Sequence, residues 1–351
     1  MQNEAVTEKR SGSRRFAPLG IIFGLVGLLL FAYFVSRAGV GEILAHIQQL
    51  GAGFLLILAV SSVRTIVRAL AWIRCVEPPH RLRFRDAFAA RLMGDALGNI
   101  IPFVSVAVSE PSKAVFVKDR VPLIVGLSAL AIENIFYSLS VALFIFAGTA
   151  TLLLTFPLPK PLRYASIGAL VTTLIIIPLV YLIIRSQSRF LSRAFGYLDD
   201  RGLGRKLATK LRPKAEGFED RIYGFYARSR RSFIGIFALD MCFHLAGVAE
   251  IFITLSFISP VAPTLTQAFI LESVNRIINV AFKFIPLRAG VDEGGTGQVS
   301  KVLGFARGIG VTLAIVRKGR DIFWSAIGLL LIWKRGHRLS ASSAATHTQA
   351  H

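Results

Sequence analysis

The sequence predicts an all-α polytopic membrane protein with about six full transmembrane helices and two re-entrant helical hairpins in an inverted repeat. Apolar residues make up 54% of the 351 residues, which is more than a soluble domain of this size carries. Uncharged runs of about 20 residues recur along the chain, and a helix needs that length to cross a bilayer. The net charge of +21 comes from basic residues gathered between these runs. This distribution is typical of cytoplasmic membrane flanks and excludes nucleic acid as the expected partner.

Six apolar runs are the predicted spans. The first, 19–35, follows basic residues and precedes no small-x-small cleavage site, so we expect an uncleaved anchor behind a cytoplasmic tail of residues 1–15. Basic residues follow the last run, 308–333, which places the C-terminus in the cytoplasm, with a disordered tail over 339–351. The protein is therefore expected to be integral to the cytoplasmic (inner) membrane. The other four runs are 54–73, 135–159, 164–184 and 233–257.

A basic segment, 186–231, divides the chain into two membrane halves, 16–185 and 232–338. Its positive charge predicts a cytoplasmic loop. Apolar residues recur at helical spacing over 190–198. Two interpretations are open: a helix lying on an anionic membrane surface, or a solvated amphipathic linker helix.

Two segments, 86–118 and 266–301, are too polar for lipid-facing spans, and each contains a proline near its middle. We interpret them as re-entrant hairpins, because broken backbone at membrane depth must be satisfied by protein or by a water-filled cavity. With both termini inside, the first hairpin enters from the cytoplasm and the second from outside, as an inverted repeat requires. Pairs of short complete spans are the alternative.

An internal alignment of Pro102 with Pro286 supports the repeat. Polar residues stand three, seven and eleven positions before each proline, and these offsets share one helical face. Packing of the two stripes against other helices is the alternative to a lined cavity. The residues are Asn99, Asp95 and Arg91 in the first half, and Lys283, Asn279 and Asn275 in the second.

Ionisable side chains at membrane depth are the candidate binding residues, because each costs about 2.5–3.5 kcal/mol on insertion scales and such groups tend to be functional. Arg64 needs a partner such as Glu110 or Glu133, whereas Arg68 has the alternative of reaching the membrane interface. The charged cluster 317–321 interrupts the last run, and it marks either a cavity or a helix end. The predicted substrate-binding residues are Arg64, Arg68, Asp95, Asn99, Glu110, Lys113, Glu133, Asn279, Lys283, Glu293, Arg317, Arg320 and Asp321.

Three short motifs resemble those of one membrane-protein family. The stretch PLRAGVDE at 286–293 is similar to the family's Pro-Gly-Gly-x-Gly-x-x-Glu, and Pro102 followed by SEPSK at 109–113 is similar to its first-half motif. Arg68 and Trp72 resemble its Arg-Trp pair, and the resemblance extends over about 16–336. The family that the chain resembles is the transmembrane, flippase-like domain of lysylphosphatidylglycerol synthases and its stand-alone relatives. Leu287 and Arg288 stand where the family has two glycines, and Ser109 also replaces a glycine, which questions close backbone approach at both hairpin tips.

The resemblance implies lipid movement between leaflets without the soluble aminoacyl-transferase domain of the synthases, so we expect no enzymatic activity. The expected ligand is a membrane lipid: an anionic or aminoacylated phospholipid, or a polyprenyl-phosphate or hopanoid lipid. The phosphate would be held by Arg64, Lys113, Arg317 and Arg320. Glu110 and Glu293 would pair either with a headgroup amine or with these cations.

Two other functions remain as alternatives. The first is a membrane-embedded transferase or hydrolase acting on lipid phosphates, although no catalytic set, metal site or cofactor motif is visible in the sequence. The second is a non-transporting accessory subunit that contacts an envelope-lipid biosynthesis partner through 186–231.

Overall fold

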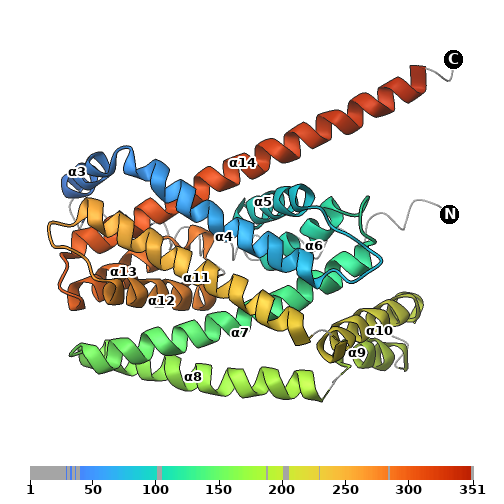
Figure 1. Ribbon diagram of the computed structural model, residues 1–351, viewed down its shortest axis with the longest axis horizontal. Helices are drawn as coiled ribbons and strands as arrows, with labels where there is room; N and C mark the ends of the chain where they lie inside the picture. The colour runs from blue at the N-terminus through green and yellow to red at the C-terminus, as the bar shows by residue number, and fades with distance from the viewer. Residues whose placement is uncertain are drawn as a thin grey trace.

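The computed structural model describes residues 29, 32–33, 36, 40–100, 105–186, 189–200, 205–228, 230–283 and 285–348. Regular structure in this part of the chain is helical throughout (Figure 1), which confirms the predicted all-α class. The elements are α3 (Val40–Leu50), α4 (Gly53–Cys75), α5 (Phe84–Ile100), α6 (Ser105–Phe116), α7 (Leu123–Thr155), α8 (Lys160–Arg185), α9 (Phe190–Asp200), α10 (Arg205–Arg228), α11 (Arg230–Ile258), α12 (Leu265–Ala281), the 3-10 turn η2 (Pro286–Arg288), α13 (Val291–Val302) and α14 (Arg307–Thr348).

Four of the described helices are long and apolar enough to cross a membrane: Gly53–Cys75, Leu123–Thr155, Lys160–Ile183 and Ser232–Ile258. They correspond to four of the six predicted runs. The predicted first span, 19–35, falls almost entirely outside the described residues. The apolar runs therefore locate these four helices correctly, because hydropathy depends only on the local sequence.

Helix α7 begins at Leu123, well before the predicted start at 135. The prediction began after Glu133 because an acid in an apolar helix is costly. In the structure this carboxylate is fully buried and contacts Arg68 and Arg91. Compensation by two arginines distant in sequence allows the helix to continue through the acid.

Helix α14 contains the predicted run 308–333 and continues to Thr348, into the segment predicted to be disordered. Its 42 residues span about 63 Å, roughly twice the thickness of a bilayer core. In Figure 1 its C-terminal part projects beyond the bundle. The cluster 317–321 lies inside this continuous helix, so it does not mark a helix end.

Two pairs of short helices, α5–α6 and α12–α13, each pack on a long helix from the other half of the chain. The pair α5–α6 contacts α14 through α5, the pair α12–α13 contacts α7 through α12, and α4 packs along α11. In Figure 1 the two pairs lie toward opposite ends of the molecule. Small residues permit this packing: a Cβ on Gly328 of α14 would lie 2.2 Å from the carbonyl oxygen of Leu92 on α5.

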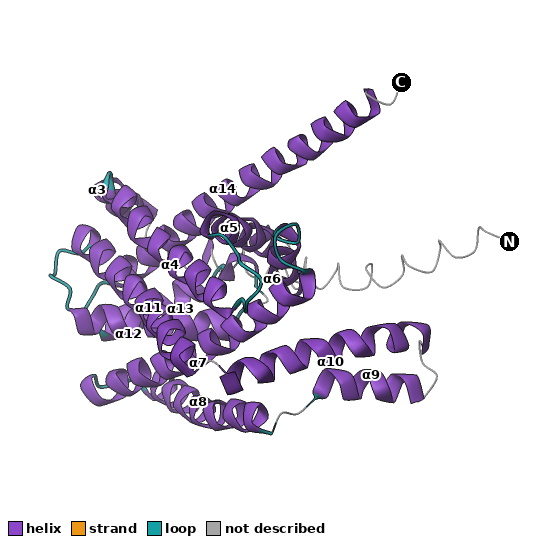
Figure 2. Cartoon of the chain, turned by 45° about the vertical axis from the view of Figure 1, so that its right-hand side comes forward, coloured by secondary structure: helices purple, strands orange, loops and turns teal. Residues whose placement is uncertain are grey.

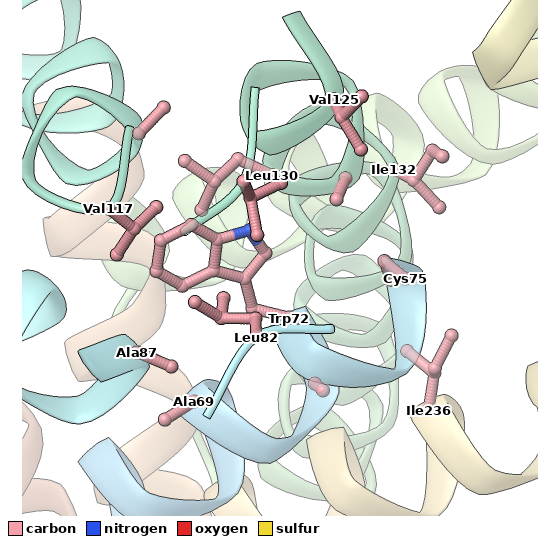
Figure 3. Close-up of a cluster of buried hydrophobic side chains, with 14 of the residues drawn as sticks. Ala69, Trp72, Cys75, Leu82, Ala87, Val117, Val125, Leu130, Ile132 and Ile236 are labelled. Carbon is pink, nitrogen blue, oxygen red and sulfur yellow. The ribbon is translucent and has the colours of Figure 1, made fainter. Parts of the chain in front are cut away.

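An apolar core around Trp72 joins α4 to its neighbours (Figure 3). The Trp72 indole is fully buried, and its Nε1–H donates to the carbonyl oxygen of Gly126 at 3.4 Å. Helices α9 and α10 lie side by side (Figure 2), and α10 also packs on α7. Ser192 of α9 hydrogen-bonds Glu219 of α10 within this pair.

Candidate binding cavity

A cavity of about 380 Å³ lies among α4, α5, α6, α7, α11, α14 and the segment 283–288. Both halves of the chain therefore contribute to its wall. Seven cationic and three acidic side chains line it among the described residues, so its wall is predominantly basic. These are Arg64, Arg68, Arg91, Lys113, Lys283, Arg288 and Arg320, with Asp95, Glu110 and Asp321.

The structure brings nine of the thirteen predicted binding residues to this cavity. They come from segments separated by up to 257 positions, which supports the lined cavity over simple packing of polar stripes. The nine are Arg64, Arg68, Asp95, Asn99, Glu110, Lys113, Lys283, Arg320 and Asp321. The other four, Glu133, Asn279, Glu293 and Arg317, do not line it.

Glu133 lies behind the cavity wall, where it compensates two arginines. Nε of Arg68 is 2.5 Å from Oε1 of Glu133, and Nη2 of Arg91 is 3.3 Å from the same oxygen. Arg68 also donates to Oδ1 of Asn134 at 3.0 Å, and its guanidinium lies 3.6 Å from the ring centre of Tyr137. Arg68 is therefore held by side chains of α7 inside the protein.

Lys113 joins the two helices of the first pair. Its Nζ is 2.8 Å from Oδ1 of Asp95 on α5 and 2.8 Å from Oε1 of Glu110 on α6. Asn134 of α7 donates to the other oxygen of Glu110 at 2.8 Å. A Cβ on Gly94 would lie 2.4 Å from Cγ of Lys113, so the missing side chain leaves the lysine room to cross α5. We call Arg68, Arg91, Lys113, Asp95, Glu110 and Glu133 the Glu133 network.

A second network joins α4 to α11 and α12. Nη1 of Arg64 is 3.3 Å from Oε2 of Glu250, and its Nη2 is 3.6 Å from Oε1 of Glu272. Nη2 of Arg276 is 2.7 Å from the same oxygen of Glu272. All four side chains are at least 89% buried, so their charges interact with little screening by water.

The same network continues to α14 and η2. Arg320 forms an ion pair with Glu250 and a second one with Asp321, at 2.7 Å. Asp321 in turn contacts Arg288 of η2 at 3.1 Å. Cations and acids thus alternate along one chain of contacts, which we call the Glu250 network: Arg288, Asp321, Arg320, Glu250, Arg64, Glu272 and Arg276.

The predicted residues that miss the cavity mainly fasten helices to each other. Arg317 of α14 contacts Asp292 of α13 at 2.7 Å, and Lys318 contacts Glu293. Glu293 also accepts a hydrogen bond from the backbone nitrogen of Gly290 at 2.7 Å. Asn279 donates to Asn275 on its own helix at 3.0 Å.

Leu287 and Arg288, which stand where the family has two glycines, adopt a backbone conformation that favours glycine. Their φ angles are +48° and +52°, in the left-handed region, where a side chain costs about 1–2 kcal/mol per residue. The backbone at 287–288 therefore has a conformation that favours glycine although neither residue is one. Arg288 adds a cation to the cavity wall.

Several residues of the site were missing from the predicted set. Glu250, Glu272 and Arg276 carried a usable signal, because each is an ionisable residue in a predicted membrane segment. Tyr137 and Trp324 were not singled out as binding residues, since aromatic residues are common in such helices. Their place in the wall follows from packing between helices.

A comparison with known families gives this cavity its context. The family described as lysylphosphatidylglycerol synthase TM region matches residues 19–328. The chain belongs to this family. The motif resemblance is thereby confirmed over nearly the whole chain. Membership makes the protein an integral membrane protein of a family linked to lipid translocation. No curated protein and no solved structure matches the chain.

Proposed function

We propose that this member of the lysylphosphatidylglycerol synthase TM region family moves a phosphate-bearing lipid between the leaflets of the cytoplasmic membrane. The observation that carries the proposal is a charged cavity between apolar, membrane-length helices, lined from both halves of the chain. Ionisable side chains inside a membrane protein are costly, and they commonly mark a substrate path. The lipid headgroup would occupy the cavity while the acyl chains remain in the bilayer.

An inverted repeat would explain how the cavity opens to either side. The described parts of α5 and α6 have 17 and 12 residues, as many as α12 and α13 have. Each short pair also packs on the long helix of the other half. A pseudo-two-fold relation predicts both features, and rocking of one repeat against the other would expose the cavity alternately.

Cysteine labelling tests the proposed topology. In a background lacking Cys75 and Cys242, a membrane-impermeant maleimide applied from outside is expected to label Ala306→Cys, beyond the second hairpin. Asp119→Cys, beyond the first hairpin, is expected to react only from the cytoplasmic side, because basic flanks stay inside. Ser105→Cys, near the first tip, should resist labelling from outside. Labelling of Ser105→Cys at the rate of Ala306→Cys would indicate two complete short spans instead of a re-entrant hairpin.

Translocation itself is tested with fluorescent phospholipids in liposomes containing the purified protein and with dithionite quenching of the outer leaflet. The wild-type protein is expected to accelerate the loss of protected fluorescence. Lys283→Gln removes an exposed cation of the cavity wall and is expected to slow translocation about tenfold, since a charge-assisted hydrogen bond to phosphate contributes roughly 1.5 kcal/mol.

Lys301→Gln is the matched control, because it removes an exposed lysine of α13 that does not line the cavity. It should translocate at the wild-type rate. Equal rates for the two variants would remove the cavity from the translocation path. A wild-type protein that moves no lipid across a panel of headgroups would contradict the proposal as a whole.

A further inference from the structure

The charges around the cavity do not cancel, and the excess is localised. In the Glu133 network three cations face three acids, so this network is neutral. Asp240 of α11 does not line the cavity, and neither of its carboxylate oxygens has a hydrogen-bond partner among the described residues.

The Glu250 network has one cation more than it has acids, because its chain of contacts begins and ends with an arginine. Arg288 forms the end at the cavity. Asp321, its partner, is shared with Arg320. The part of the cavity wall formed by α14 and η2 therefore carries excess positive charge.

Lys283 adds a second excess charge on the same side. Its side chain is exposed and lines the cavity, and no described acid lies within ion-pair distance of it. Residues 101–104 and 284, which the structure does not describe, are uncharged in the sequence. Arg91 also keeps one buried nitrogen, Nη1, without a hydrogen-bond partner among the described residues, although the arginine lines the cavity.

We propose that the cavity selects lipids whose headgroup is a dianionic phosphate, either a phosphomonoester or a pyrophosphate, over phosphodiester lipids. Lys283 and Arg288 are the residues that set this preference. A phosphomonoester carries about −1.5 to −2 charges at pH 7, which matches the two excess cations, whereas a phosphodiester carries only one negative charge. The inference rests on the proposed function, because the cavity must be the lipid path.

The backbone at Arg288 supports this assignment. A positive φ at a residue other than glycine persists only where the surroundings enforce it, and such strain gathers at functional sites. Here two consecutive residues are strained, and the second one places a guanidinium in the cavity wall. Guanidinium groups suit phosphate because their planar fork donates two parallel hydrogen bonds.

Binding can be measured apart from transport. The probes are short-chain phosphatidic acid, which is a phosphomonoester, short-chain phosphatidylglycerol, which is a phosphodiester, and inorganic phosphate. Each is titrated against the purified full-length protein in detergent, and the rise in melting temperature reports affinity. The wild-type protein is expected to bind phosphatidic acid about tenfold more tightly than phosphatidylglycerol at pH 7.5. Inorganic phosphate at the same concentration should not displace phosphatidic acid from the protein.

Substitutions in the cavity wall test the contribution of charge. Arg288→Gln and Lys283→Gln should each reduce the preference to about threefold or less, whereas Arg288→Lys should keep most of it. Lys301→Gln is the control, because it removes an exposed lysine that does not line the cavity, and it should keep the full preference.

Three results would overturn the inference. They are equal binding of the two lipids by the wild-type protein, an unchanged preference in Arg288→Gln and Lys283→Gln, and displacement of the lipid by equimolar inorganic phosphate, which would make free phosphate the ligand. A different result would contradict the proposed function: the protein would bind phosphatidic acid selectively but would move no lipid in liposomes. Translocation without headgroup preference would reject only the inference.

Discussion

Glu133→Gln is expected to lower the free energy of unfolding by about 3–5 kcal/mol, the range found when one partner of a buried ion pair is removed. The reason is specific to this site. One fully buried carboxylate compensates both Arg68 and Arg91, so its neutralisation leaves two buried arginines without their acid. Thermal unfolding in detergent, followed by fluorescence-detected size exclusion, measures the effect.

Two matched variants make this result diagnostic. Arg91→Gln should destabilise the protein less, because Glu133 keeps its contact with Arg68. Asp119→Asn breaks the ion pair with Arg335 at the protein surface, where the Asp119 side chain is 68% exposed, and should change stability by less than about 1 kcal/mol. A Glu133→Gln protein as stable as Asp119→Asn would show that the buried acid does not compensate the arginines.

Arg320→Gln is expected to reduce translocation by about 10- to 100-fold with a smaller effect on stability. Arg320 joins Glu250 of α11 to Asp321 of α14 and lines the cavity. After the substitution Glu250 keeps Arg64 and Asp321 keeps Arg288, so neither acid is left unpaired. The contact that the variant would lose to the lipid phosphate is a charge-assisted hydrogen bond of roughly 1.5–3 kcal/mol, and 1.4 kcal/mol corresponds to a factor of ten.

The liposome assay and the melting temperature test this prediction together. Arg320→Lys should give an intermediate rate, because it keeps the charge and loses the planar fork of the guanidinium. Arg189→Gln breaks an exposed ion pair with Asp220 and should translocate as the wild-type protein does. An Arg320→Gln protein with a wild-type rate would exclude this arginine from the lipid path.

The spans were predictable because hydropathy is a local property of the sequence. The runs 54–73, 164–184 and 233–257 correspond closely to α4, α8 and α11. The start of α7 was not predictable, because it depends on two arginines that lie 65 and 42 positions before Glu133. A rule based on a sliding window cannot detect such compensation.

The residues of the candidate site were also predictable only in part. Helical spacing identified one polar stripe with Asp95 and Asn99 and a second one with Lys283, and the structure places all three residues at the cavity. Spacing on α14 could not tell Arg317 from Arg320, which are one turn apart. Arg317 contacts α13, whereas Arg320 contacts α11 and lines the cavity.

The sequence by itself determined the helical class, four membrane-length helices and the charged positions at membrane depth, because these follow from composition and period. Only the tertiary structure decided which acid compensates which cation. The pairing joins residues as far apart as Arg64 and Glu250, and their distance depends on how whole helices pack. The excess charge of the cavity follows from that pairing, because it consists of the cations that outnumber the buried acids paired with them.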